Sequence, residues 1–123
     1  MIAMHSLKRK IKTQAVQKPW GKFEQFTHNE STTIKILSVG RGEAFSLQYH
    51  NNRNELWRII SGAPEITIGE SVVIGKRGDE FEIPPKTKHR VRSLETDTEI
   101  LEISFGDFDE EDIVRLEDKY GRA

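Results

Sequence analysis

Short runs of alternating apolar and polar residues fill most of this chain, and glycine or proline separates one run from the next. A period of two is typical of strands that bury one face, and glycine- or proline-rich turns are typical of antiparallel sheets. The pattern predicts strands over residues 23–26, 32–39, 44–50, 55–60, 65–68, 72–74, 80–83, 88–94 and 99–105. Many short strands with regular turns favour a closed sandwich or barrel, so the predicted fold class is all-β.

The two ends of the chain depart from this pattern. Asp109 is a residue type that caps helices, and Ile113, Leu116 and Tyr120 then recur at intervals of three and four residues. Because this spacing places apolar side chains on one helical face, we expect a short C-terminal helix lying across the barrel. The first 22 residues contain lysine and arginine but no acid. We therefore divide the chain into a basic N-terminal arm, residues 1–17, and a single domain, residues 18–123.

Composition narrows the function classes. The 123 residues include 19 basic and 20 acidic ones, for a formal net charge of −1, which argues against nucleic acid as a partner. No apolar run approaches the roughly 20 residues that cross a bilayer, and the start lacks the apolar core of a signal peptide. We therefore expect no membrane association and a cytoplasmic location. The basic start and the acidic end are compatible with a homodimer, which we also expect.

Four residues predict a metal site. The chain has no cysteine, so histidine, carboxylate or amide groups must supply the ligands. Gln48 and His50 are two residues apart on a predicted strand and share one face. Glu55 starts the next strand, and His89 lies on a strand far along the chain. Two imidazoles, a carboxylate and an amide oxygen can close around one divalent ion and leave a position for water or substrate.

The spacing of these residues resembles the two motifs of the cupin family. The first motif is matched by Gly42, Gln48, His50, Glu55 and Gly62, and the second by Gly78, Pro84 and His89. In this chain Gln48 replaces the first histidine of the family, and Lys86 replaces a usual glycine. The resemblance implies a double-stranded β-helix, which is a jelly-roll barrel, built around one metal ion.

A narrower resemblance covers about residues 18 to 122. The runs at 18–23, 45–50, 53–57, 83–90 and 111–122 are similar to the type II mannose-6-phosphate isomerase domain, the C-terminal part of bifunctional mannose-1-phosphate guanylyltransferases. The resemblance implies a metal-dependent aldose-ketose isomerase that interconverts mannose 6-phosphate and fructose 6-phosphate in GDP-mannose metabolism, here as a stand-alone chain. Glu55 and His50 would be its catalytic residues. The expected cofactor is one divalent ion, most simply zinc, although this ligand set also accepts manganese, iron or nickel.

The phosphate of such a substrate needs cations. Lys88 and Arg90 flank His89 and Arg53 lies beside Glu55, so we select these three cations as substrate-binding residues. Strict alternation places Lys88 and Arg90 on the face opposite His89, but twist at a strand end can redirect a side chain this close to the ligands, so a solvated surface and a binding role both stay open for them. Trp57 is two residues from Glu55 on the same predicted strand, so its side chain points to the same face, and we select it as a substrate-binding residue that forms a wall of the pocket.

Three departures from the family keep alternatives open. Family members usually carry histidine where this chain has Asn51, Asn52 and Leu56. Asparagine cannot shuttle a proton near neutral pH as histidine can. One alternative is therefore a non-catalytic, metal-containing module that binds a sugar phosphate and partners a separate nucleotidyltransferase. Another is a different isomerase or epimerase of the cupin type.

Overall fold

The structure is a computed structural model that describes residues 13–123, and every regular element in this range is a β-strand. The strands are β1 (Gln14–Lys18), β2 (Gly21–Gln25), β3 (Thr32–Val39), β4 (Leu47–Tyr49), β5 (Asn54–Ser61), β6 (Glu65–Ile68), β7 (Ser71–Ile74), β8 (Glu80–Ile83), β9 (His89–Arg92), β10 (Thr98–Phe105) and β11 (Val114–Glu117). The all-β prediction is confirmed. In this part of the chain no helix has the length and apolar character needed to span a membrane.

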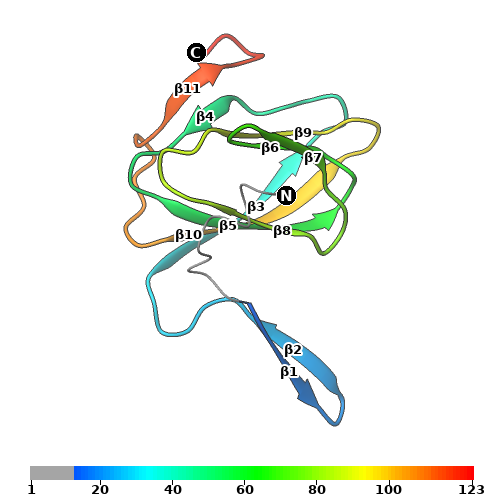
Figure 1. Cartoon of the computed structure of the whole chain (residues 1–123). Coiled ribbons are helices and arrows are strands. Elements are labelled where there is room, and N and C mark those ends of the chain that lie inside the picture. The colour runs from blue at the N-terminus through cyan, green and yellow to red at the C-terminus, as the bar shows by residue number, and fades with distance from the viewer. Residues whose placement is uncertain (1–12) are drawn as a thin grey trace.

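Two antiparallel sheets form the body of the molecule. One has the strand order β3-β10-β5-β8 and the other the order β11-β4-β9-β6-β7. Figure 1 shows the sheets facing each other around a common interior. The alternating apolar residues of both sheets fill that interior, including Trp57 and Ile100 from the first sheet and Ile66 and Val91 from the second, all at most 1% exposed. The alternation seen in the sequence therefore selects the buried face.

Strands β1 and β2 form a separate hairpin. Figure 1 shows it extending away from the barrel. Trp20, in its turn, is 72% exposed, so this large side chain does not join the core. Part of the predicted basic arm, from Gln14 onward, belongs to β1, whereas residues 1–12 lie outside the described residues.

The predicted C-terminal helix is wrong. Residues Val114–Glu117 form strand β11, which pairs antiparallel with β4 at the edge of the five-stranded sheet. Before it, the Asp112 N–H donates to the Asp109 carbonyl and the Ile113 N–H to the Glu111 carbonyl, which makes a turn. Three apolar residues at helical spacing support only a short helix, and β-branched Val114 suits a strand that finds a partner.

The predicted strand over residues 44–50 is interrupted. Ala44 makes an isolated bridge with Arg92, and regular pairing resumes only at β4, where Gln48 lies opposite His89. The register changes between these two pairs. As a result Phe45 packs edge-on against the buried Trp57 ring, with ring centroids 5.9 Å apart, although it is an odd number of residues from Gln48. The change of register thus lets Phe45 pack in the core while Gln48 stays on the face that carries His89.

Candidate metal centre

His50, Glu55 and His89 meet between the two sheets. His50 directly follows β4, Glu55 belongs to β5 and His89 begins β9. One ligand atom from each residue lies within 4.8 Å of the other two, and all three side chains are buried. Glu55 and His89 occupy inward positions of β5 and β9, and His50 continues the alternation of β4 from Gln48. The structure therefore brings together three of the four predicted ligands as donor atoms of a compact cluster.

Both imidazoles are held by main-chain carbonyl groups. The Nδ1 atom of His50 lies 2.6 Å from the carbonyl oxygen of Asp112, and that of His89 lies 2.9 Å from the carbonyl oxygen of Thr87. A carbonyl oxygen can only accept, so each Nδ1 carries the proton and donates it. The Nε2 atom of each ring keeps its lone pair, which is the arrangement found in metal-ligating histidines.

Glu55 turns one oxygen toward these two nitrogens. Its Oε2 accepts a hydrogen bond of 3.0 Å from the hydroxyl of Ser104, the opposite residue on β10. Its Oε1 lies 3.9 Å from Nε2 of His50 and 3.8 Å from Nε2 of His89. Neither Oε1 nor His89 Nε2 has a hydrogen-bond partner among residues 13–123. Buried polar atoms without partners are costly, so this set fits a divalent cation that would satisfy them.

Burial also sets the charges of the cluster. Burial lowers the pKa of His89 to about 4 and lowers the pKa of His50 as well, which keeps both rings neutral at pH 7. Burial, together with the negative charge of Glu102, raises the pKa of Glu55 to about 7. A neutral imidazole is the form that binds metals, and a bound cation favours the ionised carboxylate.

Gln48, the fourth predicted ligand, lies beside this cluster. It is half-buried and is the direct cross-strand partner of His89, so both side chains project from the same face of the sheet. The hydroxyl of Ser46 donates a hydrogen bond of 2.7 Å to Gln48 Oε1. An amide oxygen has two lone pairs, so this bond leaves one for a metal. Its role as a ligand stays a prediction.

Arg53 is the one selected cation that reaches the cluster. Its side chain is buried, its Nη2 atom lies 2.9 Å from His50 Nε2, and its Nε atom lies 3.7 Å from Glu55 Oε2. Nη2 is also 2.6 Å from His50 Nδ1. Since Nδ1 already donates to Asp112 and cannot accept, Nη2 donates to the lone pair of His50 Nε2, a bond that a metal at Nε2 would replace. On its other side, the guanidinium carbon lies 4.3 Å from the centroid of the Phe108 ring.

Trp57 lies beneath the cluster. The side chain is fully buried and meets the His89 ring edge-on, with centroids 5.5 Å apart. Its Nε1 donates a hydrogen bond of 3.1 Å to the Glu102 carboxylate on β10. This position supports the His89 ring from the core side.

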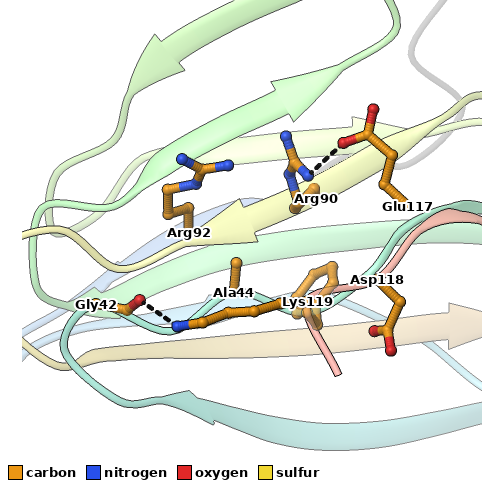
Figure 2. Close-up of a pocket in the computed structure, with 8 residues that line it drawn as sticks. Gly42, Ala44, Arg90, Arg92, Glu117, Asp118 and Lys119 are labelled. Atoms are coloured by element: carbon orange, nitrogen blue, oxygen red, sulfur yellow. Dashed lines mark hydrogen bonds and ion pairs between the residues drawn. The ribbon is translucent and has the colours of Figure 1, made fainter. Parts of the chain in front are cut away.

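Lys88 and Arg90 lie apart from the cluster. Lys88 forms an ion pair of 3.1 Å with Glu70, and Arg90 donates a hydrogen bond of 3.2 Å to Glu117. Figure 2 shows Arg90 and Arg92 side by side on β9, lining a pocket against the chain that follows β11. The structure thus places both selected cations on the outer face, which strict alternation allows, and does not bring them to the ligands as their selection expected.

The departures from the family have distinct places. Leu56 packs with Ile103 in a second hydrophobic cluster, away from the face that carries Glu55, so this exchange does not touch the ligand set. Asn51 and Asn52 form the exposed turn between His50 and β5. Their main-chain N–H groups donate to the carboxylate of Asp112, at 2.8 and 3.0 Å.

Asp112 and Lys86 are the residues that sequence reasoning missed here. Asp112 holds His50 through its carbonyl group and the adjacent turn through its carboxylate. Lys86, at the position of the family glycine, has a φ of 64°, and its N–H donates a hydrogen bond of 2.6 Å to the carbonyl of His50. Because glycine adopts positive φ readily, the usual glycine at this position in the family was a sign that Lys86 would have a left-handed backbone. A main-chain contact such as that of Asp112 leaves no mark on the sequence.

Comparisons with known proteins agree with this geometry. The family described as mannose-6-phosphate isomerase C-terminal matches residues 6–118. The xanthan biosynthesis protein XanB of Xanthomonas campestris is 35% identical over 88% of this chain. A mannose-1-phosphate guanylyltransferase of Salmonella montevideo is 36% identical over 91% of it. In both cases the chain spans only 24% of the relative's length.

Solved structures show the same fold at lower identity. Oxalate decarboxylase of Bacillus subtilis superposes with a TM-score of 0.65 at 22% identity, over 71% of this chain and 24% of that one. A cupin protein of Bacteroides fragilis superposes with a TM-score of 0.57 at 21% identity, over 63% of this chain and 70% of that one. The predicted cupin jelly roll is confirmed. By the extent of the family match and the identity to its relatives, this chain belongs to the mannose-6-phosphate isomerase C-terminal domain family.

Proposed function

We propose that this chain is a metal-dependent aldose-ketose isomerase that interconverts mannose 6-phosphate and fructose 6-phosphate in GDP-mannose metabolism. The observation that carries the proposal is the buried cluster of His50, Glu55 and His89, whose three facing atoms lie within 4.8 Å of one another. Family membership supports the isomerase class. Zinc, the homodimer and a cytoplasmic location stay predictions.

The reaction needs a group that moves a proton. It transfers one proton from C2 to C1 of the sugar and one between the attached oxygens. A bound divalent ion would supply a Lewis acid for the negative charge that develops on those oxygens. Glu55 is the proposed base in the state in which its Oε1 is not bound to the ion: Ser104 holds Oε2, so Oε1 is the oxygen that would take and return the carbon-bound proton.

His50 and Arg53 define the surroundings of that carboxylate. The Asp112 carbonyl fixes His50 with its proton on Nδ1, so Nε2 can act only as an acceptor toward the cluster. The guanidinium of Arg53 supplies positive charge beside Glu55. Because these groups are buried, their charges interact with a substrate in a medium of low dielectric constant, where electrostatic stabilisation is strong.

The test is a conversion assay on purified protein. After chelation and reloading with zinc, manganese, iron or nickel, the protein should convert mannose 6-phosphate to fructose 6-phosphate with at least one metal, and chelation should abolish the conversion. A metal at about 100 times its Kd should also stabilise the fold by about 2.7 kcal/mol, which thermal unfolding would show as a higher Tm. Inactivity with every metal would overturn the isomerase.

A non-catalytic sugar-phosphate binding module is the second candidate. It is favoured by Asn51 and Asn52, whose turn lies next to His50 and lacks the proton-shuttling histidines of the family. Calorimetric binding of mannose 6-phosphate without conversion would support the module. Conversion by the metal-loaded protein would exclude it.

A further inference from the structure

Arg115 lies in the same cross-strand row as Gln48 and His89, two of the predicted ligands, but its side chain makes no hydrogen bond or ion pair with either. On β11 Arg115 is directly opposite Gln48 of β4, and Gln48 is directly opposite His89 of β9. Opposite residues of an antiparallel pair project to the same side of the sheet, so these three side chains form a row on the inner face. The pairing of β11 becomes irregular immediately after Arg115, and such irregularities re-aim side chains next to functional sites.

Arg115 lacks the partner that a half-buried arginine normally has. Its Nε atom is buried without a hydrogen-bond partner, and no ion pair or hydrogen bond joins its side chain to any residue between 13 and 123. Arg53 and Arg90 also have an unpartnered Nε, but each lies beside a carboxylate, Glu55 and Glu117 respectively. The Nε of Arg115 thus lacks compensation for its lost hydration, whereas its Nη1 and Nη2 are not among the buried atoms without partners, so the guanidinium fork stays open to an anion from outside the chain.

We propose that Arg115 binds the phosphate group of the sugar-phosphate substrate. The proposal rests on the proposed function, since it takes the ligand cluster as the place of the reacting carbons. Two strand spacings, or about 10 Å, separate β9 from β11, which lets a hexose phosphate extend from the cluster toward Arg115. The planar fork of a guanidinium matches two phosphate oxygens, and the edge position of β11 leaves the phosphate partly hydrated.

The test is calorimetry of metal-loaded protein with mannose 6-phosphate. Arg115→Gln should weaken binding by at least about tenfold, because one charge-assisted pair is lost, and Arg115→Lys should restore part of the loss. The matched control is Arg92→Gln, which removes the same charge from the outer face of β9 and should bind as the parent does. Metal content and Tm of all variants should equal those of the parent protein.

The outcomes separate this inference from the proposed function. Unchanged binding in Arg115→Gln would overturn the role of Arg115 and leave the isomerase standing. If Arg115→Gln loses binding together with bound metal, or with a lower Tm, the result would also overturn the role of Arg115 in phosphate binding, because it would show that Arg115 supports the fold or the metal site. Binding by the parent without conversion would overturn the isomerase but uphold Arg115 if the variant binds weakly. Absence of binding of both mannose 6-phosphate and inorganic phosphate by the parent would overturn both.

Discussion

The two faces of strand β9 use charge in opposite ways. On the inner side His89 is 1% exposed, and its Nε2 lies 3.8 Å from Oε1 of the equally buried Glu55. Within residues 13–123 neither atom has a hydrogen-bond partner. On the outer side Arg90 pairs with Glu117, and Arg92 lies near Glu65. The outer face has more charge, but its charges are paired and hydrated. Arg90 Nε is also buried without a partner, but its guanidinium is paired through Nη1. Two facing buried atoms that both lack partners, rather than a high density of charge, distinguish the candidate site from the solvated surface.

The largest difference between the two sides of the sheet is expected in bound metal, when the inner carboxylate of Glu55 or the outer carboxylate of Glu117 is removed. Glu55→Gln should reduce bound metal from about one ion per chain to a small fraction, because the anionic ligand of the set is lost. Folding should persist, since a buried charge is removed and the amide can still accept from Ser104. Elemental analysis measures the metal. Glu117→Gln makes the same chemical change outside and should keep the ion; equal metal loss in both variants would contradict the contrast.

A second effect should come from the segment that holds His50. Asp112→Ala removes the acceptor of two main-chain bonds in the adjacent turn, while the carbonyl that orients His50 remains. Metal affinity should fall about 10- to 100-fold, as is typical when groups that position ligands are lost. Competition with a chelator of known affinity measures this change. Asp118→Ala is the control, since Asp118 pairs with exposed Arg122, and an equal loss there would refute the assignment.

A smaller effect, of opposite sign, is expected at Lys86. Its φ of 64° costs an L-residue about 1–2 kcal/mol, and glycine avoids that cost but gives the unfolded chain more freedom. Lys86→Gly should therefore stabilise the fold by about 0.5 kcal/mol and leave the N–H bond to His50 in place. Chemical denaturation measures the free energy of unfolding. A clear decrease would mean that the lysine side chain itself contributes to the loop.

The smallest effect is expected on the outer face. Arg90→Gln breaks an ion pair in which Glu117 is 66% exposed, so the free energy of unfolding should fall by only a few tenths of a kcal/mol. The same denaturation experiment, repeated at high salt, should show the difference shrink. A loss of several kcal/mol would show that this pair belongs to the stabilising framework and would weaken the comparison between the two faces.

Much of this molecule could be predicted from residues alone. Alternation predicted an all-β chain and most of its strands, because burial of one face imposes a period of two whatever the topology. The spacing of Gln48, His50, Glu55 and His89 predicted ligands that the structure places together or side by side. Alternation left the side of Lys88 and Arg90 open, and their selection as substrate-binding residues is not matched by the structure, which pairs them with Glu70 and Glu117 on the outer face.

The tertiary structure decided what depends on contacts between distant segments. Residues 113–120 carried a helical spacing, but the free edge of β4 made a strand the better partner. Local spacing cannot predict whether such an edge exists. The contact of Asp112 with His50 joins residues 62 positions apart in the sequence. The row of Arg115, Gln48 and His89 exists only because three strands pair in this register. The sequence determines which groups are available; only the folded chain decides which buried atoms are left without partners.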